Sequence, residues 1–259
     1  MHALFLALSL LLSLPPASAC GPYRVGFYSF GPFYHLDARG QPAGVDHDLI
    51  SALARRSGCD LRGRLESRVR TWALLERGEL DLTVSGISTP ERERTAEFWP
   101  YLRTRNHVLL PKMLARRIDS AEAFIADPAL NVGVVRGFRH GSRLDAWLDR
   151  LRSQGRVHEV TDFDALLRVL RAGRVELVLM HPLNLRPADK EWLDEFSLQD
   201  WAPQDEVEAA LVVSRSQVGA ADRARLQQAL KELLQEGQVD IILRRHLGDE
   251  LARHARLPR

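Results

Sequence analysis

The chain has only two cysteines, no excess of charge of either sign and, beyond its first residues, no long apolar run. No later run approaches the ~20 apolar residues of a membrane-spanning helix, which argues against a permanent membrane anchor. The 36 Lys and Arg and 34 Asp and Glu are scattered without blocks, a pattern that gives no support to nucleic-acid binding. The nine histidines form no metal-ligand pair on a helix face. We therefore expect a protein without metal or other cofactor.

The first 19 residues have the pattern of an export signal. Ala3 to Leu14 are almost wholly apolar, and small residues precede Cys20 at the positions that a signal peptidase reads. This apolar stretch is too short for a lasting anchor. We expect residues 1–19 to be removed and the mature protein to reside in the periplasm.

Two fates are open to the cysteines, Cys20 and Cys59. Each stands just before a predicted strand, so parallel pairing of those strands would bring them together, and export permits a disulfide. Alternatively, Ala-Ser-Ala-Cys partly resembles a lipid-attachment signal, and Cys20 would then anchor the chain through a lipid. The two fates exclude each other.

Strand and helix patterns alternate along the chain, which predicts parallel sheets with right-handed crossovers. One helix is expected from an Asp46 cap to Gly58. Asp81 reads as a cap or turn anchor. The other predicted strands are Tyr23–Tyr28, Leu61–Leu65, Leu80–Val84, Val108–Pro111, Val132–Val135, Val157–Val160, Val175–Met180 and Glu206–Ser214, and the other helices are Arg70–Arg77, Ser142–Leu151, Asp162–Arg171, Asp222–Gln235 and Val239–Leu247.

One helix–glycine–strand unit occurs twice. Leu74–Val84 aligns with Val169–Leu179, with the capping glycine, acidic residue and strand in the same register. This repeat predicts two lobes of like topology. Ligands of such sheets bind beyond the carboxyl ends of the strands. The ends of the copied strands, at Ser85 and His181, should therefore face each other across a cleft.

The first of these strand ends is suited to an anion. Gly86 permits close approach to the main chain, and Ser88 offers a hydroxyl. Pro90 suits the first position of a helix, whose amino terminus carries partial positive charge. Arg92 adds a full charge with fork-shaped donors. A carboxylate would bind well here.

Several short motifs occur in this chain in the same order as in a known family. Taken together, they resemble those of the periplasmic solute-binding proteins of the polar amino-acid class, the bacterial extracellular solute-binding proteins of family 3. These are receptors of ABC importers. The resemblance covers nearly all of residues 22–250 and is carried by Gly31-Pro-Phe-Tyr34, Gly40, Gly44-Val-Asp-His-Asp-Leu49, Gly78-Glu-Leu-Asp81, Gly86-Ile-Ser-Thr-Pro-Glu-Arg92, Phe98, Pro100-Tyr101 and Ala172-Gly-Arg-Val-Glu-Leu177.

The resemblance implies an α/β, two-lobed type II periplasmic-binding-protein fold. Each lobe would hold a mostly parallel sheet flanked by helices. Two crossing strands, about Asn106–Lys112 and Glu206–Val213, would join the lobes. Lobe 1 would comprise residues 20–108 and 207–259, and lobe 2 residues 109–206. The implied protein is a monomer with an ABC transporter or a membrane sensor as its partner.

The same resemblance implies where the ligand binds. The Phe30 ring would wall the ligand, while Gly86, Ser88 and Arg92 would take its carboxylate. Because the family has one more residue between the glycine and the arginine, Arg94 is the alternative to Arg92.

Four further ligand candidates come from departures from the family pattern. Arg68 stands near a usual aromatic position, although a solvated helix-start residue is the alternative. Arg139 and His140 lie in the turn before the second-lobe helix. His181 replaces the aspartate that usually holds the ligand ammonium, and its alternative role is to cap the next segment.

These features predict a non-enzymatic receptor for a small polar solute that bears a carboxylate, such as an amino acid or a related acid. Positive charge on the inferred cleft favours an acidic ligand, unless Asp46 or Glu91 restores negative charge. One alternative is an enzyme on the same fold, like a cyclohexadienyl or arogenate dehydratase, with His181 as general acid. Another is a sensor that presents its closed form to a membrane signalling protein.

Overall fold

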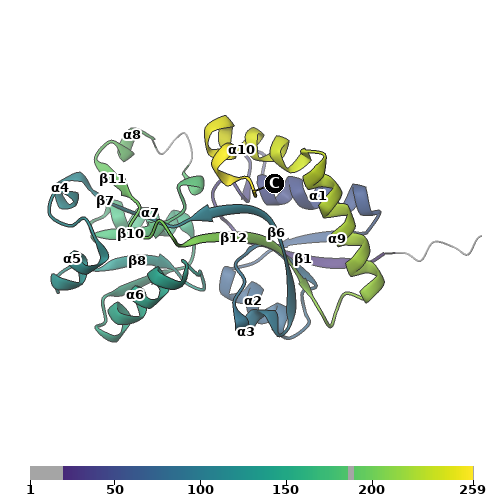
Figure 1. Cartoon of the computed structure of the whole chain (residues 1–259), viewed down its shortest axis with the longest axis horizontal. Coiled ribbons are helices and arrows are strands. Elements are labelled where there is room, and N and C mark those ends of the chain that lie inside the picture. Colours follow the sequence, from purple (N-terminus) through teal and green to yellow (C-terminus); the bar gives the residue numbers. More distant parts are fainter. Residues whose placement is uncertain (1–19, 186–189, 259) are drawn as a thin grey trace, which may run out of the picture.

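The chain folds into two α/β lobes, which Figure 1 shows side by side. The computed structural model describes residues 20–185 and 190–258, so the predicted export signal, residues 1–19, lies outside the described part. Among the helices that are described, none is long and apolar enough to cross a membrane.

Lobe 1 is built around a five-stranded sheet with the order β4-β1-β5-β12-β6. β1 pairs in parallel with β4 and β5, whereas β12 runs antiparallel to β5 and β6. The strands are β1 (Tyr23–Phe27), β4 (Leu61–Leu65), β5 (Leu82–Gly86), β6 (Ala96–Arg105) and β12 (Glu206–Ser214), and a small hairpin is formed by β2 (His35–Leu36) and β3 (Pro42–Ala43).

Helices cover both faces of this sheet, as Figure 1 shows. One group buries its apolar side against β1, β5 and β12 and consists of α1 (Val45–Ser57), α9 (Ala220–Gln235) and α10 (Gln238–Ala255). On the other face lie α2 (Arg68–Glu76) and α3 (Pro90–Glu93). Because both faces are covered, every residue of the central strand β5 is buried, including the polar Thr83 and Ser85.

Lobe 2 has a second five-stranded sheet with the order β11-β7-β10-β8-β9. Its strands are β7 (His107–Pro111), β8 (Val132–Val135), β9 (Val157–Val160), β10 (Leu177–Met180) and β11 (Phe196–Gln199). α5 (Ala121–Ala126) and α6 (Ser142–Ser153) pack on one face, and α7 (Phe163–Arg171) on the other. The short elements are α4 (Lys112–Ala115), the 3-10 turn η1 (Pro182–Asn184) and α8 (Lys190–Leu193).

Two strands carry the chain between the lobes. β6 ends at Arg105 and β7 begins at His107, so Asn106 joins the two sheets. β12 brings the chain back and pairs with β6 along its whole length (Figure 1). The first connecting strand was predicted at Asn106–Lys112, but most of that range is β7, a strand of the second sheet. The strand that leads from lobe 1 to Asn106 is β6, which the sequence patterns did not predict.

The repeated unit has the expected structure in both lobes. α2 leads into β5, and α7 leads into β10, each through a glycine in the left-handed region: Gly78 with φ 70° and Gly173 with φ 62°. β5 lies between β1 and β12, and β10 lies between β7 and β8. Each copy therefore supplies the central strand of its sheet.

Several predicted element starts are wrong: α2 and α9 begin two residues earlier than predicted, and β10 begins two residues later. Gly44 caps α1, and Asp46 is the second helical residue, because its carboxylate is held by side chains from distant strands. β5 begins two residues later than predicted, since the Leu80 N–H still donates to the Leu74 carbonyl in the turn that ends α2 (3.2 Å). The expected anchor role of Asp81 is confirmed, because its carboxylate accepts hydrogen bonds from the main-chain N–H and guanidinium of Arg24.

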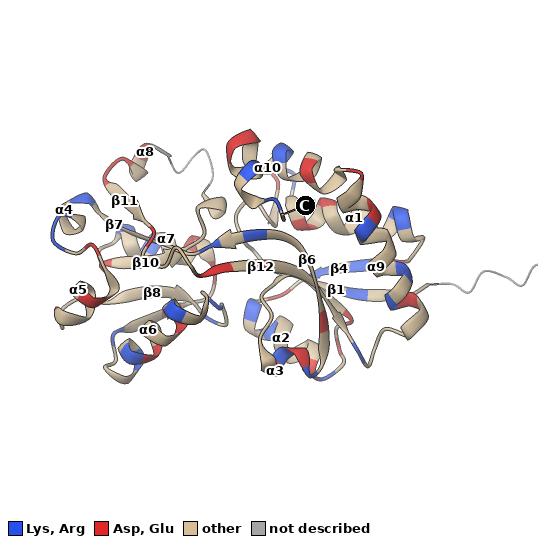
Figure 2. Cartoon of the chain, viewed as in Figure 1, with Lys and Arg blue, Asp and Glu red and all other residues tan. Residues whose placement is uncertain are grey.

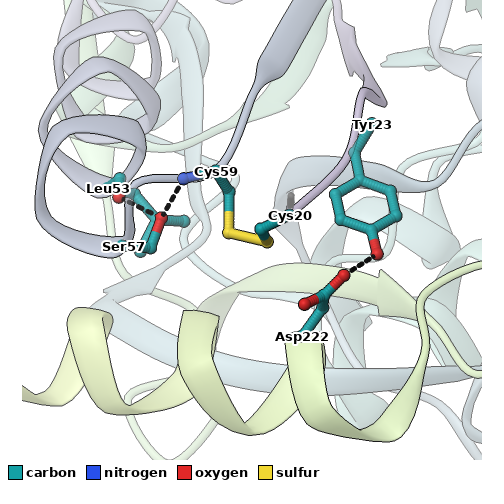
Figure 3. Close-up of a disulfide and its surroundings, with 6 residues drawn as sticks. All are labelled: Cys20, Tyr23, Leu53, Ser57, Cys59 and Asp222. Atoms are coloured by element: carbon teal, nitrogen blue, oxygen red, sulfur yellow. Dashed lines mark hydrogen bonds between the residues drawn. A yellow bond between two sulfur atoms is a disulfide. The ribbon is translucent and has the colours of Figure 1, made fainter. Parts of the chain in front are cut away.

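A disulfide ties the start of β1 to the segment before β4. Cys20 and Cys59 are bonded, with their Cα atoms 4.6 Å apart (Figure 3). The parallel register that sets Tyr23 opposite Leu61 brings the two cysteines together, as predicted. Lipid attachment at Cys20 would need the same sulfur atom. Next to the bridge, the Tyr23 hydroxyl donates to Asp222 of α9 and so fixes the chain start to that helix.

Charged side chains of both signs are mixed over the two lobes. In the view of Figure 2, Lys and Arg alternate with Asp and Glu on most helices.

Candidate functional site

The ends of the two copied strands meet at one small cavity between the lobes. Ser85, from β5, and His181, which follows β10, both line it, as the repeat predicted. The cavity measures about 10 Å³, which is about the room that one water molecule needs. Aromatic and aliphatic side chains fill the rest of the cleft. The other lining residues are Phe30, Phe33, Ile87, Leu102, Thr104, Phe138 and Ala209.

Aromatic rings from the two lobes touch across this cleft. Phe30 of lobe 1 lies 4.9 Å from Phe138, which the loop between β8 and α6 supplies. The Phe30 ring also stands edge-on to His181 at 6.1 Å. A solute as large as an amino acid requires these rings, and hence the lobes, to move apart.

Ser85, at the base of the cleft, is hydrogen-bonded to Tyr28 and Arg68, which line the cleft, and to Asp46, which lies beneath it. Its φ of 48° is uncommon for a residue with a side chain, and such backbone strain concentrates at functional sites. The Ser85 carbonyl accepts hydrogen bonds from the Tyr28 hydroxyl (3.1 Å) and from Nη2 of Arg68 (3.2 Å). Its hydroxyl donates to the Asp46 carboxylate (2.9 Å).

Asp46 is a fully buried carboxyl group beneath the base of the cleft. Burial raises the pKa of Asp46 to about 7, while hydrogen bonds from Tyr101 and Ser85 act in the opposite direction. Burial and the nearby Asp46 charge in turn raise the pKa of the Tyr101 hydroxyl. Asp46 therefore changes charge near neutral pH, next to the residue that binds Arg68 and Tyr28.

Arg68 is not a solvated helix-start residue, because only 2% of its surface is exposed. Its guanidinium carbon lies 4.2 Å from the Tyr28 ring centroid and 4.5 Å from that of Phe138. Both rings present π-faces to a cation. Nε and Nη1 of Arg68 are buried without a hydrogen-bond partner. Burial, followed by the charge of Arg92, holds the pKa of Arg68 well below its usual range.

Arg92 links the two lobes through main-chain oxygens. It stacks 3.6 Å from the Trp72 ring centroid and donates to the carbonyls of Ile87 (2.9 Å) and, across the cleft, Gly137 (3.2 Å). Burial and the charge of Arg139 lower the pKa of Arg92 to about 10. The alternative, Arg94, is exposed.

Ser88 and Gly86, the other lobe 1 residues predicted to bind the carboxylate of the solute, do not face an open site in this structure. The Ser88 hydroxyl donates to the Glu93 carboxylate. Gly86 is buried in β5, where a Cβ would come within 2.2 Å of the Val212 side chain, so only glycine fits. Ser88 and Arg92 therefore make their hydrogen bonds within the protein in this closed arrangement.

His181 is buried and neutral. Its Nδ1 lies 3.0 Å from the Thr104 hydroxyl. It occupies the N-cap position of η1, as its alternative role predicted, and caps through its main-chain carbonyl, which accepts from the Asn184 N–H (2.9 Å), without a side-chain bond. Burial, with the nearby charges of His140 and Arg68 adding to it, lowers the pKa of His181 to about 3.

The start of α6 already holds a carboxylate from this chain. Asp205 accepts hydrogen bonds from the main-chain N–H of Arg143 (2.7 Å) and the hydroxyl of Ser142 (3.1 Å). His140, just before this helix, is buried with Nδ1 facing Asp145 (3.3 Å), and Arg139 is half-buried. An external anion at this helix start would have to displace Asp205.

The structure thus brings the predicted residues Phe30, Arg68 and His181 to the cleft. Sequence reasoning did not include Phe138, which contacts Phe30 and Arg68, or Tyr101, which binds Asp46, among the site residues. The signal for Phe138 was its position in a loop after a strand of the second lobe, where such folds bind ligands. Among the described residues, no group of three or more His, Cys, Asp or Glu side chains is placed to hold a metal ion.

Known proteins match this architecture. The family model of the bacterial extracellular solute-binding proteins, family 3, matches residues 23–249. A probable histidine-binding protein of Neisseria gonorrhoeae is 29% identical over 126 residues, which are 48% of this chain and 46% of that protein, so the match spans about half of each.

Two solved structures illustrate the fold. The arginine-, lysine-, histidine-binding protein ArtJ from Geobacillus stearothermophilus has a TM-score of 0.73 at 20% identity, covering 90% of this chain and 98% of its own. A histidine kinase sensor domain with similarity to periplasmic binding proteins reaches 0.73 at 18% identity, covering 91% and 97%. The family match over most of the chain and the shared two-lobed fold lead to one conclusion: this chain belongs to the bacterial extracellular solute-binding proteins of family 3.

Proposed function

We propose that this chain is an exported, monomeric receptor that closes its two lobes over a small carboxylate-bearing solute, an amino acid or a related acid, and delivers it to an ABC importer. The observation that carries the proposal is the set of contacts across the cleft. Arg68 of lobe 1 packs on Phe138 of lobe 2, and Arg92 donates to the Gly137 carbonyl. Two lobes joined by two strands close by hinge motion in such receptors.

Charge and polarity at the cleft support a carboxylate as the recognised group. Arg68 and Arg92 lie on one side, and Arg139 lies close enough to lower the pKa of Arg92. Among the described residues that line the small cavity of Ser85 and His181, none is Asp or Glu. A negatively charged group on the solute would offset this excess of positive charge.

The proposal is tested by a thermal-shift screen of amino acids and small organic acids. A ligand present at 100 times its dissociation constant stabilises the folded state by about 2.7 kcal/mol. We expect at least one small acid to raise the melting temperature and to be recovered chemically unchanged. A protein that binds none of them, or that converts the bound compound, contradicts the proposal.

Signal reception is a second candidate, because the histidine kinase sensor domain shares this fold over nearly its whole length. In that case the closed form would present its surface to a membrane signalling protein. Purified importer subunits and purified sensor partners, each tested for binding to the ligand-loaded receptor, distinguish the two roles. Binding of the importer alone supports transport.

An enzyme on this fold is less well supported. A dehydratase needs a general acid in the cleft. His181 occupies the expected position, but its pKa of about 3 leaves a neutral imidazole with no readily donated proton at neutral pH. Asp46 has a more suitable pKa, but its carboxylate is engaged by Ser85 and Tyr101 beneath the cleft floor.

A further inference from the structure

The guanidinium of Arg68, where the lobes meet, has no carboxylate partner among the described residues. Only 2% of the Arg68 surface is exposed. Of its guanidinium nitrogens, Nη2 has a hydrogen-bond acceptor, the Ser85 carbonyl. Nε and Nη1 have none among the described residues. Buried guanidinium groups are normally paired with carboxylates, since desolvation of an unpaired charge is costly.

Arg68 lines a second cavity between the lobes, of about 350 Å³. This volume lies in the range of small-molecule pockets. Tyr28 and Phe138 border it, and the amino-terminal ends of two nine-residue helices from opposite lobes reach it. α2 contributes Ser67 and Arg68, and α7 contributes its cap, Asp162. Two helix amino termini therefore add partial positive charge to that of Arg68.

The carboxylates at this cavity already have partners. Glu66 forms ion pairs with Arg64 and Arg70, both at 2.9 Å. Asp162 accepts hydrogen bonds from the main-chain N–H of Ala165 and from the Thr161 hydroxyl, both at 2.8 Å. Neither is hydrogen-bonded to Arg68.

Further positive charge lies beside Arg68. Its guanidinium carbon is 5.7 Å from the centroid of the Trp72 ring, on which Arg92 stacks at 3.6 Å. Repulsion between the two guanidinium groups contributes to the lowered pKa of Arg68. Closing the lobes gathers these charges together, so a bound anion would favour closure.

We propose that the solute carries two acidic groups and that Arg68 binds the second of them in this inter-lobe cavity. The solute class is a small dicarboxylate or an acidic amino acid. This inference rests on the proposed receptor function, because Phe138 covers one face of Arg68 and belongs to the opposite lobe. When the lobes separate, Phe138 withdraws with lobe 2 and the unpartnered N–H groups become accessible to a carboxylate.

The test compares matched pairs of solutes by isothermal titration calorimetry at one ionic strength. The pairs are glutamate with glutamine, aspartate with asparagine, and succinate with butyrate. We expect at least one diacid to bind 30-fold or more tightly than its singly charged partner. This is about the effect of removing one member of a buried charge pair. Arg68→Met should bring that ratio close to one, and Arg68→Lys should restore part of it.

Arg77→Met is the matched control. Arg77 follows the last residue of α2 and pairs with Glu79 at the surface, away from the cavity, so this variant should keep the wild-type ratio. A neutral or basic amino acid as the tightest ligand, with unchanged affinity in Arg68→Met, overturns the diacid inference and leaves the receptor function standing. If no solute of the panel binds, the receptor function fails and the inference fails with it.

Discussion

The guanidinium of Arg68, on the first turn of α2, lies 4.5 Å from the ring of Phe138, which belongs to the opposite lobe. The contact joins a charged group of one lobe to an aromatic face of the other. It therefore couples two properties of the protein: the stability of the closed arrangement and the charge available to a ligand.

Replacing Arg68 with methionine should stabilise the ligand-free protein. A buried charge without a counter-ion costs stability, and exchanging buried charged groups for apolar ones of similar volume is often neutral or stabilising by about 1–4 kcal/mol. Methionine can also pack against Tyr28 and Phe138. We expect a rise of a few degrees in the melting temperature measured by calorimetry, whereas the surface variant Arg77→Met should change little. A clear fall for Arg68→Met would show that its contacts with the rings outweigh the cost of burial.

Phe138→Ala should shift the ligand-free protein toward an open arrangement. The change removes the ring contacts to Arg68 and Phe30 across the cleft. Small-angle scattering should then give a larger radius of gyration than for the wild type. Phe196→Ala is the control, because Phe196 packs on Trp192 within lobe 2. Identical scattering from Phe138→Ala and wild type would remove Phe138 from the closing contacts.

Asp46 should make stability depend on pH in the direction opposite to an ordinary ion-paired aspartate. Burial raises its pKa from 3.8 to about 7, so the folded state binds the proton more tightly than the unfolded state does. The free energy of unfolding should therefore fall as the pH rises from about 4 to 7. The expected contribution is on the order of 2–4 kcal/mol.

Urea denaturation of wild type and Asp46→Asn across this pH range isolates that contribution. The difference between the two proteins should change with pH and level off above pH 7. Asp48→Asn, on the same helix, is the control, because contacts with His246 and Arg245 lower the pKa of Asp48 below its usual value of 3.8. The contribution of Asp48 to stability should therefore be nearly constant over this pH range and be lost only as the pH falls below about 4. Parallel curves for Asp46→Asn and wild type would contradict the buried, titrating carboxyl.

Loss of the disulfide should lower stability substantially. The bridge closes a segment with a sequence separation of 39 residues, for which the loop-entropy model gives about 4 kcal/mol. The double variant Cys20→Ser, Cys59→Ser should unfold at a lower urea concentration than the oxidised wild type. The mature wild-type protein should weigh two hydrogen atoms less than its reduced form. A mass that includes a lipid on Cys20 would contradict the bridge.

Local sequence patterns predicted best those strands that an apolar or alternating run marks. β4, β8, β9 and β12 have the predicted bounds, because apolar or alternating runs mark them. β6 was missed, since Pro100 and several charged residues interrupt its pattern. A register shift against β12 occurs at Pro100 and Leu102, on either side of Tyr101. Such irregularities re-aim side chains, and the Tyr101 hydroxyl reaches Asp46 and Ser85.

The missed features of the site depend on contacts between distant segments. Asp46 was predicted to cap α1, because it precedes an apolar helical pattern. Its actual partners come from β5 and β6. Arg68 is the first residue of α2, two residues before the predicted start of that helix, and its burial depends on Tyr28 and on Phe138 from the other lobe. The spacing of residues along one helix contains no information on such contacts.

Ligand-dependent closure is the central claim, and small-angle scattering with and without solute tests it most directly. The mature protein is measured alone and then with the tightest-binding acid from the calorimetric panel at saturation. We predict that the radius of gyration falls on binding and that the acid is recovered unchanged. An unaltered radius of gyration at full saturation, or chemical conversion of the acid, would contradict a receptor that closes over its solute.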